Sequence, residues 1–487
     1  MTNITQATQN AANAFEAYSK LTASKRADFL EAIANNIEAL GADLLEVANK
    51  ETNLPLARLT GERGRTCFQL KMFASMLRKG DYVDATIDTA VPDKTPPKPD
   101  IRQMLYPLGP VVVFGASNFP FAYSTAGGDT ASALAAGCPV IVKAHPAHLQ
   151  TSTLVAGAIQ QAIISNAIPE NTFQHIIATD FSAGKALVQD ENIAAVGFTG
   201  SRTGGRALYD YANARKNPIP VFAEMGSINP VVLLEGALIE RAENIAINYA
   251  GSITLGMGQF CTNPGILIGV KSKALTLFAD HLAKELNNAV IAPMLHEGIQ
   301  TAYFKNSSHA LHQKGITCLT TNTPTVNAAY PVLTTVDASV FLANSDLAEE
   351  VFGPYSILVQ CENIDQLIQV WKSIKGQIST TIMGTDHDFE KNKNILQIAT
   401  DIAGRVLLNG VPTGVEVCDS MVHGGPYPAS TDSRFTAVGV KAVKRWLRPI
   451  SFQNWPDHLL PSYLKNKNEL GIWRTINGEF TKSDVTV

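Results

Sequence analysis

A single cysteine lies in a glycine-rich stretch whose composition suits a reactive thiol. Cys261 belongs to residues 256–265, which read GMGQFCTNPG. A thiol attacks carbon as its thiolate, and its ordinary pKa of about 8.5 responds to the surroundings. Small neighbours leave room for a covalent adduct and let backbone N–H groups approach it. Taken alone, the stretch is equally compatible with a tight turn around a small buried cysteine.

Two further polar groups follow strand-like segments. Asn118 comes after the apolar run 111–115, and a side-chain amide there can donate to an oxyanion. Glu224 ends the run 221–224, and a partly buried carboxylate can activate water. Each has an ordinary alternative, because asparagine is common in turns and a lone glutamate is usually a solvated or paired surface group. The candidate catalytic residues are therefore Cys261 as nucleophile, Glu224 as base and Asn118 as oxyanion donor.

Other motifs suit a nucleotide. A lysine that ends the apolar strand 139–144 can reach hydroxyls or a phosphate, although such lysines also snorkel to solvent. Residues 198–205, FTGSRTGG, run from a strand into a helix, where exposed N–H groups favour a pyrophosphate; their spacing is not GxGxxG. Residues 349–354, EEVFGP, place a second carboxylate before an aromatic turn. The candidate cofactor-binding residues are Lys143, His145, Gly200, Ser201, Gly205, Glu350 and Phe352.

The elements that must position these groups alternate along the chain. From residue 110, short apolar strands alternate with helices, a pattern typical of a doubly wound parallel sheet. A second such series runs from about 229 to 420. Ligands bind such sheets at the carboxyl ends of the strands, where the candidate residues fall. Helices are expected over 9–50 and about 63–77, a proline-rich connector at 92–99, a strand at 101–106, and an irregular tail from 446.

Composition narrows the class of protein. The 487-residue chain is 45% hydrophobic and carries a net charge of −4 without a basic block, which argues against nucleic acid or an anionic membrane as partner. Residues 1–6 lack the pattern of a secretory signal, and no apolar run approaches the ~20 residues that span a bilayer. The six cysteines are scattered without a CxxC pair. We therefore expect a cytoplasmic protein and no metal site.

The candidate catalytic residues, in their order along the chain, resemble the aldehyde dehydrogenase family. Residues 118–120 (NFP) are similar to its oxyanion segment, 224–226 (EMG) to its general-base segment, and 258–261 (GQFC) to its nucleophile segment. The resemblance implies that Cys261 attacks an aldehyde, that hydride transfer leaves a thioester, and that Glu224 activates water to release the acid. A cofactor-free cysteine hydrolase or a non-catalytic binding protein on the same scaffold would leave several of these motifs unused.

The resemblance extends to the cofactor motifs. Lys143 matches a ribose-binding lysine, residues 198–205 a phosphate turn, and residues 350–354 (EVFGP) a motif whose glutamate holds the nicotinamide ribose. One departure matters. The family's common KPAE is here KAHP, residues 143–146, so a carboxylate that often holds the adenine ribose 2′-hydroxyl is missing. With Lys143 and His145 nearby, this favours NADP, with NAD as the alternative.

Two sequences point to a branch of the family. Residues 258–265 (GQFCTNPG) and 421–428 (MVHGGPYP) look like the branch of 2,5-dioxovalerate (α-ketoglutaric semialdehyde) dehydrogenases and their NADP-dependent fatty-aldehyde relatives. The expected substrate is therefore 2,5-dioxovalerate, oxidised to 2-oxoglutarate, with a broad or fatty aldehyde as the alternative. A distal carboxylate needs a cationic pocket, to which Arg434 and Arg202 are conceivable contributors.

The resemblance also implies a domain plan. Residues 1–90 and 107–225 are expected to form the dinucleotide-binding domain and 226–420 the catalytic domain. Residues 91–106 and 446–487 are expected to form an oligomerisation arm with the C-terminal tail. Residues 421–445 would return to the cofactor domain. A homodimer or homotetramer joined through the arm is implied.

Overall fold

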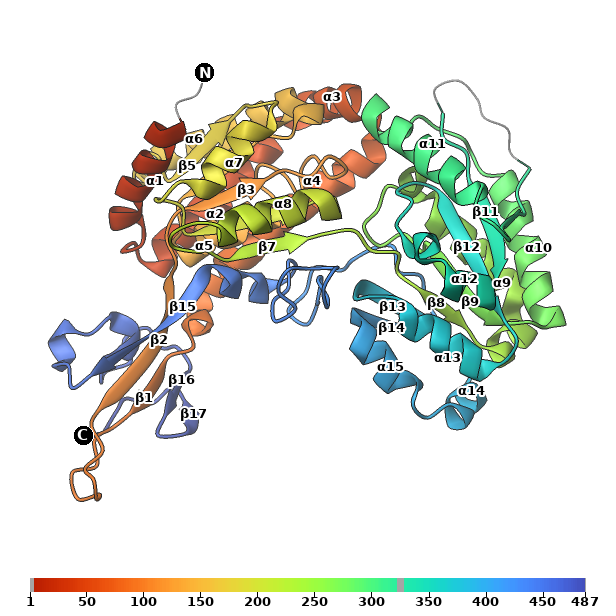
Figure 1. Cartoon of the computed structure of the whole chain (residues 1–487). Coiled ribbons are helices and arrows are strands. Elements are labelled where there is room, and N and C mark those ends of the chain that lie inside the picture. Colours follow the sequence, from red (N-terminus) through yellow and green to blue (C-terminus); the bar gives the residue numbers. More distant parts are fainter. Residues whose placement is uncertain (1–3, 322–327, 487) are drawn as a thin grey trace.

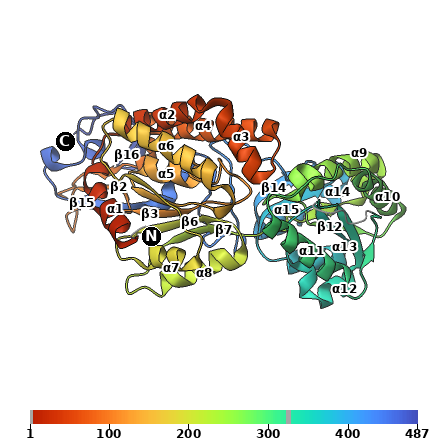
Figure 2. The same cartoon turned by 90° about the horizontal axis from the view of Figure 1, so that it is seen from above.

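The computed structural model describes residues 4–321 and 328–486, so the parts of the expected ranges at 1–3, 322–327 and 487 lie outside the described residues. The strands form three sheets: one in each of two lobes that lie side by side, and one in an arm that projects from the first lobe (Figures 1 and 2). This confirms the expected α/β architecture with a small arm. Among the described helices, none is both long and apolar enough to cross a bilayer.

The first lobe contains a five-stranded, fully parallel sheet in the order β5-β4-β3-β6-β7. Every residue of β3 is buried, which explains why this strand is apolar on both faces. Helices cover both faces of the sheet (Figure 1). The strands are β3 (Val111–Phe114), β4 (Val140–Lys143), β5 (Phe173–Ile176), β6 (Ala195–Thr199) and β7 (Val221–Glu224). The helices are α1 (Ile4–Tyr18), α2 (Ala23–Ala39), α3 (Gly41–Thr52), α4 (Leu56–Lys79), α5 (Gly128–Ala136), α6 (Leu149–Ser165), α7 (Phe181–Gln189) and α8 (Arg202–Asn213).

The second lobe contains a seven-stranded sheet in the order β10-β11-β12-β9-β8-β13-β14, parallel except for the edge strand β10. The strands are β8 (Val231–Leu233), β9 (Ile266–Val270), β10 (Thr317–Cys318), β11 (Val332–Asp337), β12 (Tyr355–Cys361), β13 (Gln377–Met383) and β14 (Ala403–Leu408). The helices are α9 (Glu235–Thr254), α10 (Lys273–Asn287), α11 (Glu297–Leu311), α12 (Ala338–Ala343), α13 (Ile364–Ser373), α14 (Asp386–Lys391) and α15 (Ile395–Ile402).

The C-terminal tail was expected to be irregular, but it forms strands in the sheet of the arm. Three strands of that tail join two earlier ones in a sheet of order β15-β2-β1-β16-β17. Because β1 belongs to this sheet, the arm starts before residue 91. The strands are β1 (Thr86–Asp88), β2 (Ile101–Pro107), β15 (Leu447–Gln453), β16 (Arg474–Ile476) and β17 (Glu479–Thr481). Short 3₁₀ helices are η1 (Asp81–Val83), η2 (Pro146–His148), η3 (Leu255–Gly258), η4 (Ser345–Ala348), η5 (Val440–Trp446), η6 (Asp457–Leu459) and η7 (Ser462–Leu464).

Residues 421–445 connect the second lobe to the arm along the edge of the first lobe. Backbone hydrogen bonds join Met225 to Ala429 (2.8 Å) and Thr431 to Ala223 (3.0 Å), so residues 429–431 run beside β7. The crossing segment therefore lies between the carboxyl end of β7 and the second lobe. This is the seam at which the candidate residues meet.

Candidate active site

The nucleophile loop is built on unusual backbone conformations. Gly256, Met257 and Gly258 all have positive φ, of 55°, 56° and 66°. A Cβ atom on Gly258 would lie 2.3 Å from the backbone of Gly353, so a larger residue does not fit there. Cys261 follows this turn, and the Asn229 amide donates to its carbonyl oxygen at 2.9 Å. The glycines therefore shape and pack the loop as well as leaving space around it.

Asn118 lies next to the same loop. It is buried, and its Nδ2 donates to the carbonyl oxygen of Gln259 at 3.1 Å. Asn118 and Cys261 line one cavity, although they come from different lobes. An amide has a second N–H, so this side chain can also donate to an oxygen bound beside the sulfur.

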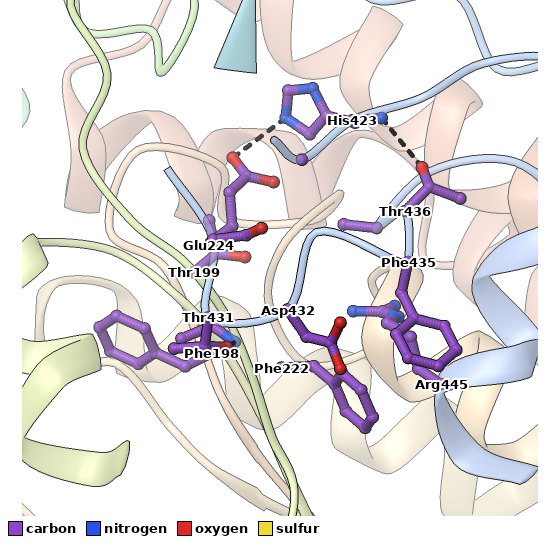
Figure 3. A pocket seen from close by; sticks show the side chains of 14 residues that line it. Phe198, Thr199, Phe222, Glu224, His423, Thr431, Asp432, Phe435, Thr436 and Arg445 are labelled. Atoms are coloured by element: carbon purple, nitrogen blue, oxygen red, sulfur yellow. Dashed lines mark hydrogen bonds and ion pairs between the residues drawn. The ribbon is translucent and has the colours of Figure 1, made fainter. Parts of the chain in front are cut away.

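Glu224 and His423 lie together behind the sulfur. Glu224 ends β7 with 4% of its side chain exposed, and its Oε1 lies 3.0 Å from Nε2 of the fully buried His423 ring. The same Nε2 lies 3.5 Å from Sγ of Cys261. Figure 3 shows the Glu224 carboxylate and the His423 ring pointing at one another. The structure thus adds a histidine that the sequence-based site did not include.

Close backbone packing puts His423 in this position. A Cβ on Gly425 would lie 2.1 Å from the carbonyl oxygen of Gln377 in β13, and one on Gly404 in β14 would lie 2.2 Å from that of Gly424. The backbone N–H of His423 donates to Oγ1 of Thr436 at 2.9 Å (Figure 3). The His-Gly-Gly sequence was quoted above only as a branch signature. Its two glycines allow this close approach of the backbones, and the approach places the histidine beside Cys261.

The surroundings of Cys261 keep its thiol protonated at rest. Burial raises the pKa of the thiol well above its ordinary value, and the negative charge of Glu224, a hydrogen bond to its carboxylate and the negative charge of Glu350 raise it further. The positive charge of Arg65 opposes this only in part. Attack by this sulfur therefore needs a group that removes its proton.

A cavity of about 600 Å³ opens on Cys261 and extends along the end of the first sheet. Burial raises the pKa of Glu350 to about 7, against the opposing effect of the Ser227 backbone N–H. At the far side, Ser201 caps α8 by accepting a hydrogen bond from the Gly204 N–H at 3.2 Å. The sequence-predicted residues that line this cavity are Asn118, Gly200, Ser201, Glu224, Cys261, Glu350 and Phe352.

Known proteins identify this arrangement. Residues 1–434 match the model of the aldehyde dehydrogenase family. The chain belongs to the aldehyde dehydrogenase family. It is 46% identical over 99% of its length to α-ketoglutaric semialdehyde dehydrogenase of Acinetobacter baylyi, of which it covers 92%. It is 47% identical over 98% of its length to α-ketoglutaric semialdehyde dehydrogenase 2 of Azospirillum brasilense, of which it covers 91%.

Solved structures agree on the fold. The NADP-dependent glyceraldehyde-3-phosphate dehydrogenase of Bacillus halodurans, complexed with NADP, superimposes with a TM-score of 0.78 over 92% of this chain and 90% of its own, at 21% identity. The protein is therefore an NAD(P)-dependent aldehyde dehydrogenase. This assignment excludes the alternative of a cofactor-free hydrolase.

The cavity fits the dinucleotide that this family uses. Helix α8 points its N-terminal N–H groups toward the cavity beside Gly200, as an anionic pyrophosphate requires. Gly226 has no Cβ, and an added one would lie 2.3 Å from Oε2 of Glu350. The lack of a side chain at Gly226 therefore leaves room for the Glu350 carboxylate at the cavity wall.

Three of the predicted cofactor residues lie outside the cavity lining. Gly205 packs its backbone on Met225, where a Cβ would lie 2.7 Å from Cγ. Lys143 ends β4, half-buried, within electrostatic range of Asp180, and burial lowers the pKa of its amine. The His145 ring stacks on His148 at 5.6 Å, and burial lowers its pKa to about 4.

Proposed function

We propose that this enzyme oxidises 2,5-dioxovalerate (α-ketoglutaric semialdehyde) to 2-oxoglutarate. The observation that carries the proposal is the 46–47% identity, over nearly the whole chain, to two enzymes named for that activity. In this scheme Cys261 attacks the aldehyde carbon, and the Asn118 amide and a backbone N–H of the loop hold the oxyanion. The bound dinucleotide supplies the hydride acceptor. Glu224 then removes a proton from the water that hydrolyses the thioester.

Basic side chains near Cys261 support a substrate with a remote carboxylate. Arg65 of α4 donates through Nη1 to the carbonyl oxygen of Val415, and Arg405 of β14 donates to that of Gly414 at 3.1 Å. Arg405 also donates to the carbonyl oxygen of Pro412, so the two guanidinium groups bind residues 412–415 from opposite lobes. The Nε atoms of both are buried and have no partner among the described residues. Each arginine also interacts electrostatically with Cys261.

We assign Arg65 and Arg405 to the distal carboxylate. Four carbon–carbon bonds of about 1.5 Å separate the aldehyde carbon from the carboxylate carbon, so the two ends lie about 5 Å apart. Such a short substrate keeps its carboxylate near the cysteine. Arg434, considered above, is 79% exposed and paired with Asp432 at 2.6 Å. Arg202 lines the cofactor cavity and pairs with Glu349 at 3.4 Å.

Steady-state kinetics test the substrate. The enzyme should use 2,5-dioxovalerate with a higher kcat/KM than succinic semialdehyde or decanal. Arg65→Gln and Arg405→Gln should each raise the KM for 2,5-dioxovalerate by about tenfold, the loss of one charged hydrogen bond, and leave that for decanal unchanged. Arg434→Gln is the matched control and should change neither. Equal or better use of decanal by the wild type would rule out the dicarboxylate substrate.

We also propose that NADP is preferred over NAD. The missing carboxylate in residues 143–146 and the positive charge of Lys143 support this. Lys143→Gln should raise the KM for NADP more than that for NAD, because it removes a cation that suits a 2′-phosphate. A wild-type enzyme with equal kcat/KM for both cofactors contradicts the preference.

We propose a homodimer or homotetramer that assembles through the arm, in the cytoplasm. Strand β2 is paired on both edges within the arm, so we expect other residues of the arm to make the contact between subunits. Trp473 and Phe480 stack there at 4.8 Å and are 42% and 64% exposed. Light scattering should give a multiple of the 52.3 kDa chain mass, and a Trp473→Ser/Phe480→Ser variant should shift toward monomer. A monomeric wild type contradicts this. The six unpaired cysteines support a reducing compartment.

A further inference from the structure

We infer that His423 is the base that takes the proton from the Cys261 thiol. This inference rests on the proposed role of Cys261 as nucleophile, and it separates the base that activates sulfur from the base that activates water. The geometry carries it: one nitrogen, Nε2, lies 3.5 Å from Sγ and 3.0 Å from a carboxylate oxygen of Glu224. One imidazole nitrogen thus faces both the thiol that would lose the proton and the carboxylate that would stabilise the charged ring.

The position of His423 has little other explanation. Its ring is fully buried, and Nδ1 has no hydrogen-bond partner among the described residues. Nδ1 therefore satisfies no buried polar group around it. The Glu224 carboxylate lies 3.0 Å from Nε2, so once Nε2 has taken the thiol proton it can donate a charged hydrogen bond to that oxygen. Leaving an unpaired nitrogen such as Nδ1 buried costs stability, and sites that retain such groups are commonly functional.

The charged groups around the sulfur explain why a base is needed. Glu224 comes from β7, Glu350 from the segment before β12, and Arg65 from α4. All three act on the thiol, and their combined effect with burial raises its pKa well above the ordinary value. The other titratable groups that interact with it are Tyr123 and Arg405. The Glu224 carboxylate hydrogen-bonds the thiol, and Nε2 of His423 lies 3.5 Å from Sγ. Transfer of the proton to His423 keeps the Glu224 carboxylate ionised for its proposed role on water.

The proton transfers balance over a full cycle. The S–H bond breaks with its electron pair left on sulfur, and an N–H bond forms at Nε2, where the Glu224 carboxylate stabilises the charged ring. The sulfur pair bonds to the aldehyde carbon, and the carbonyl electrons move to the oxygen held by Asn118. When water later attacks the thioester, Glu224 takes its proton and passes it to solvent. The sulfur leaves as thiolate and recovers its proton from His423.

Alkylation of Cys261 by iodoacetamide measures this step without aldehyde or cofactor. Peptide mass spectrometry should follow Cys261 and the exposed Cys318 in the same full-length sample, because Cys318 reports the reagent and the fold elsewhere. At pH 7 the rate at Cys261 should fall by about 100-fold in His423→Asn, the usual worth of a positioned base. The rate should recover as pH rises and the thiol ionises unaided. Cys318 should react equally in all variants.

Two further variants separate catalysis from structure. In His423→Ala, free imidazole should restore alkylation of Cys261 in proportion to its concentration, which a purely structural histidine would not allow. Glu224→Gln should lose thioester hydrolysis while keeping a larger share of the alkylation rate than His423→Asn. The inference is overturned by a wild-type alkylation rate in His423→Asn, by a loss that is the same at every pH, or by absence of imidazole rescue. A wrong substrate assignment would leave every one of these results unchanged, and Cys261→Ala tests the nucleophile itself by NADPH formation.

Discussion

Replacing Gly226 by alanine should weaken cofactor binding without unfolding the protein. The residue lies two positions after Glu224, and a Cβ there would lie 2.3 Å from Oε2 and 3.2 Å from Cδ of Glu350. Real Cβ atoms do not approach so closely, so something must move. The nearest atom is the end of a flexible side chain, so Glu350 rotates and the backbone stays in place.

The cost follows from what Glu350 gives up. Leaving its rotamer costs about 0.5–1.5 kcal/mol, and losing its hydrogen bond from the Ser227 N–H costs about 1 kcal/mol. These two costs apply with or without cofactor and together lower the free energy of unfolding by about 2 kcal/mol. If the carboxylate holds the nicotinamide ribose, its displacement also removes a charged hydrogen bond to the cofactor, worth about 1.5–3 kcal/mol, which corresponds to an NADP⁺ affinity lower by roughly 10- to 150-fold.

Fluorescence titration of NADPH and the KM for NADP⁺ measure this effect, with thermal unfolding beside them. The matched control is Gly251→Ala in α9, because a Cβ there meets no heavy atom within 4 Å. The control should bind NADPH as the wild type does and gain about 0.5–1 kcal/mol of stability from helix propensity. If Gly226→Ala binds NADPH with wild-type affinity, Glu350 does not hold the cofactor and the reasoning fails.

Three other outcomes are expected. Since burial raises the pKa of Glu350 from 4.5 to about 7, its ionised form, the better acceptor for ribose hydroxyls, appears as pH rises through 7. The KM for NADP⁺ should therefore fall between pH 6 and 8, and Glu350→Gln should remove this trend; an unchanged trend contradicts the assignment. Gly258→Ala should unfold at a clearly lower temperature, since its positive φ alone costs about 1–2 kcal/mol and Gly353 blocks the added atom; wild-type melting would be inconsistent with this. Zn²⁺ should inhibit reversibly, because donor atoms of Glu224, Cys261 and His423 lie within 4.8 Å of one another; a chelator should restore activity, and equal inhibition of His423→Asn would exclude this site.

The sequence was enough to predict where most of the site would be, because parallel sheets bring strand ends together. Asn118 follows β3 and Glu224 ends β7, and both lie by the same cavity as Cys261. The order of the strands was therefore enough to predict that these motifs lie close together. The catalytic roles of these residues remain predictions that the variants above will test.

His423 and the strands of the C-terminal tail escaped prediction for a physical reason. Cys261 and His423 are 162 residues apart, and their contact depends on how Gly424 and Gly425 pack on β13 and β14. No local periodicity encodes such a contact. The strands β16 and β17 have three residues each, too few for an alternating pattern, and they form only because β1 offers an open edge.

The way the loop is held predicts that chemistry at the sulfur can be changed without loss of the fold. Its backbone is fixed by side chains that point at carbonyl oxygens: Asn118 at Gln259, and Asn229 at both Cys261 and Asn263, at 2.9 to 3.1 Å. None of these contacts uses the thiol. The sulfur itself faces the cavity and His423, so Cys261→Ala should keep the wild-type unfolding temperature to within the small cost of one lost contact. By the same reasoning, replacing a loop glycine should disturb the backbone and lower stability, whereas replacing His423 should slow proton transfer and leave the fold intact.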